Sequence, residues 1–193
     1  MIYVTMKELN EKLLEKLKDA SKVVFMGIGE EKLRDDAVGP YIISELLSFS
    51  NNKFLFINAG IDPMSRIDQI VDFQPTHLVL LDTCTLKKPP GTIAIIERSH
   101  IKELVPISSH TIPIHVVVDL ISDKLSKLEV FMIGFVPESL EGFTTLNLYK
   151  EKEFTFEERG ENIDLPFFEI NLTETVQRAA DKVLNSLQKI LKL

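Results

Sequence analysis

The stretch around which this chain is organised reads Gly27-Ile28-Gly29-Glu30-Glu31-Lys32-Leu33-Arg34-Asp35-Asp36-Ala37-Val38-Gly39-Pro40. The apolar run before it, residues 23–26, predicts a buried strand, and residues 41–47 after it have the apolar spacing of a helix. The glycines allow a sharp turn where the strand stops. Because open α/β sheets bind ligands outside the carboxyl ends of their strands, we expect a site near Asp35 and Asp36.

Composition indicates an ordinary globular protein. The chain has 193 residues, of which 45% are apolar and 26% charged, which suggests one domain. The net charge of -7 gives no support to nucleic-acid binding. Cys84 is the single cysteine, which excludes an internal disulfide and fits a reducing compartment. With no long apolar run and no signal peptide, we expect a cytoplasmic protein without membrane insertion. The sequence does not fix the oligomeric state, and a monomer is the default expectation.

Strands and helices alternate along the sequence. We expect strands at 22–26, 54–57, 78–82, 92–96 and 130–134, and helices ending near 48, spanning 62–73, starting at 113, and starting after a cap at Asn171. This order predicts an α/β fold of three layers, in which a twisted, mostly parallel (mixed) sheet carries helices on both faces. Strand 92–96 is expected to be antiparallel, because so little chain precedes it.

Residues after Gly134 change in character. The segment from Leu146 to Phe168 is charged and aromatic. We interpret the whole chain, 1–193, as a single domain with an inserted arm at about 146–168. The arm could shape substrate docking or cover a sheet edge.

Three polar side chains follow predicted strands or precede a predicted helix: Asp36, Asp82 and His110. The ends of neighbouring strands converge in a doubly wound sheet, so these residues could meet and hold a divalent metal with open positions. Each also has an ordinary structural explanation. Asp36 could cap a helix, as we expect Asp35 to do; Asp82 could bond a neighbouring loop, and His110 could be a polar loop residue.

Other candidates are weaker. Cys84 could be a soft fourth ligand or a nucleophile, although a buried free thiol is the commoner case. We interpret the other three histidines as structural or solvated. A dinucleotide loop at Gly27-x-Gly29 is disfavoured, since Lys32 occupies the position that needs a third glycine or alanine.

The joint order of several short motifs resembles one known family. These motifs are the opening stretch itself, Asn58-Ala59-Gly60, Pro75 to Cys84, Pro90-Gly91, Ser108 to Pro113 and Ile133 to Glu138. Together they resemble the NiFe-hydrogenase maturation endopeptidases of the HycI/HybD type over about residues 23–143. The chain departs from that family at Glu30, at Met64-Ser65 and at Val136. These departures leave the three candidate ligands intact and bear on substrate choice, because loops around a site set what docks there.

The resemblance implies a hydrolase of the aspartyl-type endopeptidase kind. Such an enzyme removes a C-terminal extension from a hydrogenase large-subunit precursor after nickel insertion, with nickel as the recognition element. Asp36, Asp82 and His110 would bind the metal, Asp36 and Asp82 would act in catalysis, and the isolated protein would be metal-free. A different class of function, a nickel-binding chaperone or checkpoint protein without hydrolysis, stays open from the sequence.

Overall fold

The structure is a computed structural model that describes residues 2–3, 6–105, 112–141 and 171–192. The strands are β1 (Ile2–Tyr3), β2 (Val23–Ile28), β3 (Phe54–Gly60), β4 (His77–Thr83), β5 (Ile93–Glu97) and β6 (Glu129–Phe135). The helices are α1 (Met6–Leu17), α2 (Val38–Leu46), α3 (Ile67–Phe73), α4 (Arg98–Leu104), α5 (Ile114–Lys124) and α8 (Glu174–Ile190). Short 3₁₀ helices are η1 (Arg34–Ala37), η2 (Leu47–Phe49) and η3 (Pro63–Arg66).

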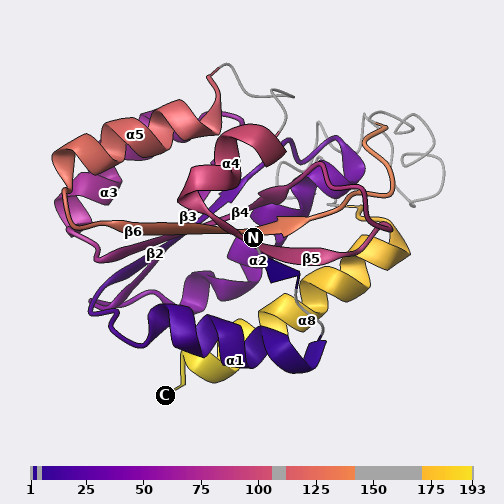
Figure 1. Cartoon of the computed structure of the whole chain (residues 1–193), viewed down its shortest axis with the longest axis horizontal. Coiled ribbons are helices and arrows are strands. Elements are labelled where there is room, and N and C mark those ends of the chain that lie inside the picture. The colour runs from indigo at the N-terminus through magenta and orange to yellow at the C-terminus, as the bar shows by residue number, and fades with distance from the viewer. Residues whose placement is uncertain (1, 4–5, 106–111, 142–170, 193) are drawn as a thin grey trace, which may run out of the picture.

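One mixed sheet of six strands, in the order β1-β5-β6-β4-β2-β3, forms the centre (Figure 1). The four strands β3, β2, β4 and β6 are parallel, whereas β5 runs antiparallel to β6 and β1 antiparallel to β5. The predicted fold class is therefore confirmed, including the antiparallel strand near 92–96. Because four neighbouring strands run the same way, their carboxyl ends lie at one edge, where a site is expected.

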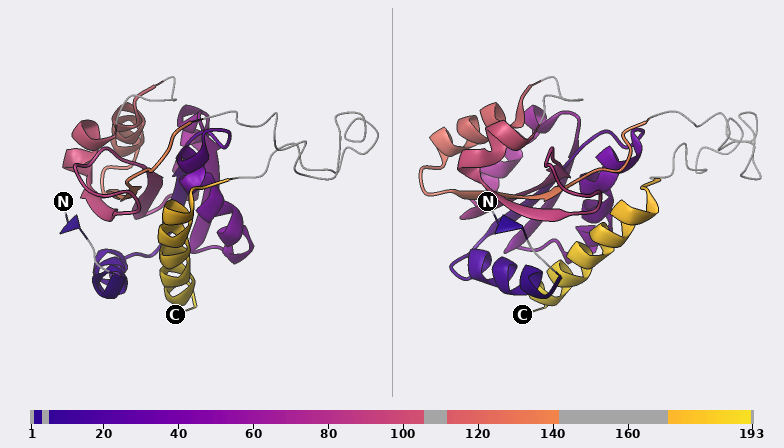
Figure 2. Two further views of the ribbon diagram at one scale, coloured as in Figure 1. Left: turned by 90° about the vertical axis from the view of Figure 1, so that its right-hand side faces the viewer. Right: turned by 45° about the vertical axis from the view of Figure 1, so that its right-hand side comes forward.

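Helices cover both faces of the sheet. Helices α1, α2 and α8 lie on one side, and α3, α4 and α5 on the other (Figures 1 and 2). Each face of the sheet has its own hydrophobic core, and alternate residues of the central strands belong to one core or the other. Phe25 and Val79 pack toward α1, α2 and α8, while Met26 and Leu80 pack toward α3, α4 and α5. All of β4 is buried, as its unbroken apolar sequence predicts for a central parallel strand.

The ends of several elements differ from expectation. Asp62 caps η3 as predicted, accepting a hydrogen bond from the Ser65 amide, with Pro63 following it. The cap of the last helix is wrong by two residues, because the Thr173 hydroxyl, and not Asn171, accepts from the Val176 amide. The sequence pattern predicts no helix at residues 98–104, which form α4. The predicted arm at 146–168 lies outside the described residues, and the single-domain assignment stays a prediction.

Helix α2 lies unusually close to the sheet at Gly39. A Cβ atom built there would lie 2.2 Å from the Leu81 carbonyl oxygen and 2.6 Å from the Ile28 carbonyl oxygen. Both contacts are with backbone atoms, which cannot rotate away as a side chain can. Glycine at this position therefore lets the first turn of α2 rest directly on β2 and β4, next to the edge where these strands end.

We predict that Gly39→Ala lowers the free energy of unfolding by about 2–3 kcal/mol, because the added methyl group overpacks this contact. Thermal unfolding followed by circular dichroism measures the change. Gly60→Ala is the matched control: Gly60 has a φ of 53° and no atom within 4 Å of a built Cβ. Its expected loss is smaller, about 1 kcal/mol, and reflects backbone conformation alone. Equal losses in the two variants would contradict the close approach.

Candidate functional site

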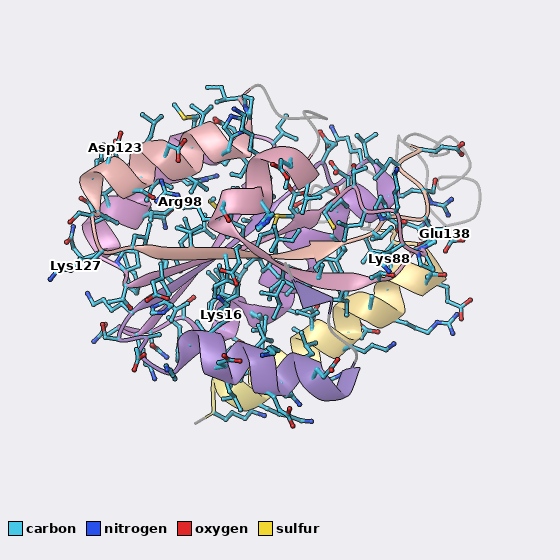
Figure 3. All side chains as sticks on the ribbon, in the orientation of Figure 1. Lys16, Lys88, Arg98, Asp123, Lys127 and Glu138 are labelled. Atoms are coloured by element: carbon cyan, nitrogen blue, oxygen red, sulfur yellow. The ribbon has the colours of Figure 1, made fainter. Side chains whose placement is uncertain are left out.

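The candidate site lies where the parallel strands end. Asp36 belongs to η1, which follows β2, and Asp82 and Thr83 are the last residues of β4. Figure 3 labels two residues of neighbouring loops at this end, Lys88 after β4 and Glu138 after β6, and Lys127, before β6, at the opposite end. Asp36 and Asp82 are each only 2% exposed.

The turn after β2 folds back on itself and fixes Asp36. The Glu30 amide donates to Asp36 Oδ2 at 2.7 Å, and the Asp36 amide donates to the Leu33 carbonyl at 3.1 Å. Gly29 has a φ of 136°, and a Cβ built there would clash with the Asp36 carbonyl oxygen at a distance of 1.8 Å. Only glycine permits this turn, so the position of Asp36 depends on it.

Thr83 brings the two carboxylates together. Its hydroxyl lies 3.2 Å from Asp36 Oδ1 and 3.5 Å from Asp82 Oδ1, and its amide donates to Asp82 Oδ1 at 2.6 Å. A hydroxyl carries one proton, so it donates to one carboxylate at a time, and the shorter distance favours Asp36. Asp36 and Asp82, 46 positions apart, thus flank one buried hydroxyl. Their role as metal ligands and catalytic groups stays a prediction.

Asp35 does not cap the following helix, as the sequence suggested. The N-cap of α2 is Ala37, without a side-chain hydrogen bond. Asp35 is instead fully buried, and its carboxylate accepts from the amides of Glu138, Ser139 and Thr173 at 2.7–2.9 Å. The Thr173 hydroxyl adds a fourth bond at 3.0 Å. Asp35 therefore ties η1 to the loop after β6 and to the start of α8, directly beside Asp36.

The thiol of Cys84 is a poor candidate for a nucleophile. Cys84 is 1% exposed and packs over Gly134, whose built Cβ would lie 2.8 Å from Sγ. Burial, with a smaller contribution from the negative charge of Asp82, raises the pKa of Cys84 to about 12. A thiol with that pKa is protonated at neutral pH, and the thiolate is the nucleophilic form. The structure therefore favours the buried free thiol over the nucleophile.

His110, the third predicted ligand, lies outside the described residues. Within the part of the chain that is described, no three His, Cys, Asp or Glu side chains gather closely enough to hold a metal. His77 fits its predicted structural role: it is 3% exposed at the start of β4, far from the carboxylates along the strand, and Nδ1 lies 3.0 Å from Thr76 Oγ1.

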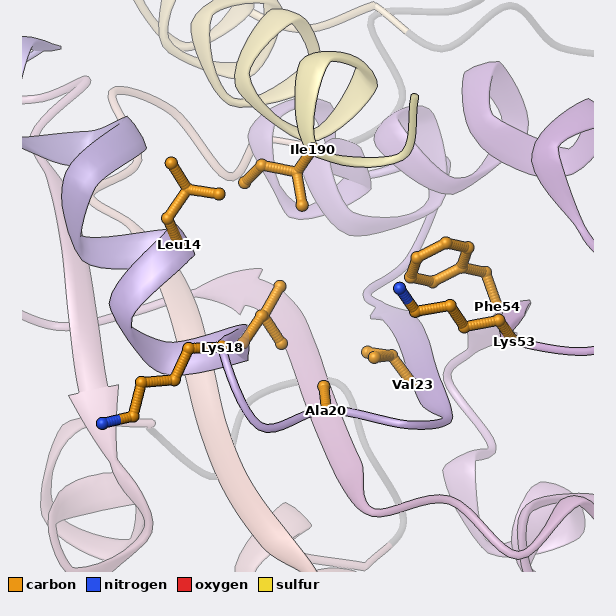
Figure 4. Close-up of a pocket in the computed structure, with 8 residues that line it drawn as sticks. Leu14, Lys18, Ala20, Val23, Lys53, Phe54 and Ile190 are labelled. Atoms are coloured by element: carbon orange, nitrogen blue, oxygen red, sulfur yellow. The ribbon is translucent and has the colours of Figure 1, made fainter. Parts of the chain in front are cut away.

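Two cavities lie away from this site. One, of about 130 Å³, is lined by apolar side chains of α1, α8 and the first residues of β2 and β3, with Lys18 and Lys53 beside them (Figure 4). The other, of about 250 Å³, is lined by residues 74–76 and 124–128, which precede β4 and β6. Both therefore belong to the amino-terminal edge of the parallel strands, opposite Asp36 and Asp82.

Sequence reasoning missed Thr83 and the role of Asp35. A threonine next to a strand-end aspartate is a weak local signal for a shared hydroxyl. No local signal identifies the partners of Asp35, because they are 103, 104 and 138 positions away.

Comparison with known proteins gives consistent results. The family model described as hydrogenase maturation protease (HycI) matches residues 40–153. A protein of Methanocaldococcus jannaschii assigned as a hydrogenase maturation protease is 34% identical over 141 residues, covering 69% of this chain and 82% of that protein. The hydrogenase 3 maturation protease of Escherichia coli K12 is 25% identical over 115 residues, covering 60% and 72%.

Solved structures share the fold. The crystal structure of the NiFe-hydrogenase maturation protease HycI from Thermococcus kodakarensis aligns with a TM-score of 0.72 and 21% identity, covering 94% of this chain and 99% of that chain. The hydrogenase maturating endopeptidase HybD from E. coli aligns with a TM-score of 0.63 and 20% identity, covering 89% and 92%. In the described residues no helix is both long and apolar enough to cross a bilayer.

We predict that Asp35→Asn lowers the free energy of unfolding by about 3 kcal/mol, because the amide turns N–H groups toward buried N–H and O–H donors. For a domain of this size that corresponds to a fall in melting temperature of roughly 10 °C.

Asp62→Asn provides the control for the same chemical change. The Asp62 carboxylate accepts one exposed hydrogen bond, from the Ser65 amide, and asparagine caps helices as well as aspartate does. The control should melt within about 1–2 °C of the unchanged protein. If the two variants have the same melting temperature, Asp35 does not hold η1, the loop after β6 and the start of α8 together.

Proposed function

Because this chain belongs to the hydrogenase maturation protease family, and is thus a peptidase, we propose that it removes the C-terminal extension of a NiFe-hydrogenase large-subunit precursor. The observation that supports this best is the pair Asp36 and Asp82, buried at the carboxyl ends of neighbouring strands around the Thr83 hydroxyl. Cleavage follows nickel insertion, and nickel in the precursor is the recognition element.

The carboxylate pair suits a divalent cation. Two negative charges held close together in a buried place repel each other, and a cation between them relieves that repulsion. Carboxylates are hard ligands, whereas nickel favours imidazole and sulfur more strongly. With His110 as the third ligand, the site alone holds nickel weakly, and thiolates of the precursor complete its coordination. Binding then depends on nickel already loaded in the substrate.

The chain's own residues supply the rest of the chemistry. Nickel carried by the precursor polarises the scissile carbonyl as a Lewis acid. Asp36 accepts a proton from the attacking water. Thr83 keeps the carboxylates of Asp36 and Asp82 at their separation, and the amide of Glu30 orients Asp36. In this proposal the partner is the precursor protein. The enzyme binds it as a monomer, in the cytoplasm.

We predict that the protein shortens a nickel-loaded large-subunit precursor and leaves the nickel-free precursor intact, since loaded nickel completes the site. Intact-protein mass spectrometry measures the loss of the extension. Asp82→Asn serves as the control and should reduce the cleavage rate by about a hundredfold or more, because it removes a metal-binding charge.

One result would contradict the peptidase function, and another would contradict the bridging role of nickel. Complex formation without any loss of mass would favour a nickel-binding chaperone or checkpoint protein. Retention of one equivalent of nickel by the isolated protein after dialysis against a chelator would show that precursor thiolates are not needed to hold the metal.

The role of Thr83 leads to a separate prediction. Thr83→Val replaces the hydroxyl by a methyl group of similar size, so the carboxylates lose the group between them and cleavage slows by about tenfold. Thr83→Ser keeps the hydroxyl and should stay within about threefold of the unchanged enzyme. Cleavage rates and melting temperatures are measured together. Equal rates for the valine and serine variants would show that the hydroxyl has no part in the site.

A further inference from the structure

Arg34 has an unusual backbone for its residue type. Its φ is 46°, in the left-handed region, where a side chain costs roughly 1 kcal/mol or more relative to glycine. Gln74 is the other described non-glycine residue with positive φ, at 54°, and it has an ordinary explanation as the left-handed cap that ends α3. Arg34 instead stands at the start of η1, immediately before the two buried aspartates.

The conformation of Arg34 follows from its neighbours. Asp35 must turn inward to reach the loop after β6 and the start of α8, and Asp36 must turn back to the Glu30 amide. Glycine would meet the same geometry with less strain. The turn thus explains the backbone of Arg34 and leaves its long cationic side chain unexplained.

The Nε atom of Arg34 makes no hydrogen bond to the described part of the fold around it. The residue is half-buried, and the Nε atom itself is buried. A buried N–H donor without a partner costs about 1–3 kcal/mol. The donors of the hydrogen bonds described above for the Asp35 and Asp36 carboxylates are backbone amides and threonine hydroxyls. The Arg34 guanidinium is not among these donors.

We infer that Arg34 is a specificity residue that binds a carboxylate of the substrate segment beside the scissile bond. This inference rests on the proposed function. A guanidinium group presents Nε and a terminal nitrogen as a planar fork that matches the two oxygens of a carboxylate. Nε is shielded from solvent, so the atoms that cover it must shift slightly before a bound carboxylate can accept its hydrogen bond. The hydrogen bonds of Asp35 fix the backbone on which Arg34 stands, two residues before Asp36, so both residues belong to one short helix.

Arg34→Gly is the decisive variant, because it removes the guanidinium and relieves the backbone strain at once. It should melt at the same temperature as the unchanged protein or higher, while KM for the nickel-loaded precursor rises by about tenfold or more and kcat changes much less. Arg34→Lys keeps the charge without the fork, and its KM should lie between the two. A purely structural role would instead lower the melting temperature of Arg34→Gly.

The carboxylate can come from an acidic side chain of the extension or from its free C-terminus, and substrate variants distinguish these two sources. One precursor carries amides in place of the acidic side chains of its extension. A second precursor, made by peptide ligation, ends in a carboxamide in place of the free C-terminal carboxylate. The change that removes the partner should raise KM for the unchanged enzyme and have no effect on Arg34→Gly. Charge exchange tests the contact directly: Arg34→Glu should regain affinity for a precursor with lysine at that position.

The outcomes keep this inference apart from the proposed function. Cleavage by the unchanged protein with equal KM in Arg34→Gly overturns the role of Arg34 and leaves the function intact. Without any cleavage the proposed function fails, and Arg34 is then tested by the dissociation constant for the same precursor. A tenfold weaker complex with Arg34→Gly supports the contact; equal affinity, or no binding by either protein, overturns it.

Discussion

The buried carboxylate of Asp35 holds together the part of the molecule where the candidate site lies. It gathers three amides and one hydroxyl from two other segments, and its own amide donates to the Ser139 carbonyl at 3.2 Å. A buried carboxylate is stable only when such donors replace water. The turn after β2, the loop after β6 and the start of α8 are therefore ordered together, and Asp36 inherits its position from them.

The sheet supplies the second part of the site independently. Asp82 and Thr83 end a strand buried on both faces, which pairs with β6 along its whole length and with β2 as far as Leu81. Asp36 comes from a turn and Asp82 from a strand, so the carboxylates approach each other from supports of different kinds. The Thr83 hydroxyl lies at the junction, where a rigid strand meets a folded-back turn. Such preorganisation spares a bound metal or substrate the cost of ordering its ligands.

The sequence predicts those parts of the fold that depend on local pattern. Residues 78–82 are apolar enough to specify a central parallel strand, and Asp62-Pro63 carries the local chemistry of a helix start; both expectations are confirmed. Asp35 was misjudged, because a carboxylate before a helix suggests a cap, whereas its actual partners are distant in sequence. The sequence pattern predicts Asn171 as the cap of the last helix, and the structure uses Thr173, two residues further on. The places of Asp36 and Asp82 after strands predict that they could meet, and the family resemblance names the same two residues, whereas the Thr83 hydroxyl between them depends on tertiary packing.

The attachment at Asp35 also bears on how this chain tolerates change in length. Ser139 and Thr173 both bond the same carboxylate, so their backbones are neighbours in space although 34 positions separate them. The sequence between two anchored points can grow or shrink with little effect on the body, because the entropy of closing a loop rises only slowly with its length. The position between Ser139 and Thr173 is therefore one where the chain tolerates insertions close to its carboxylates. Added sequence there can change substrate recognition without changing the sheet.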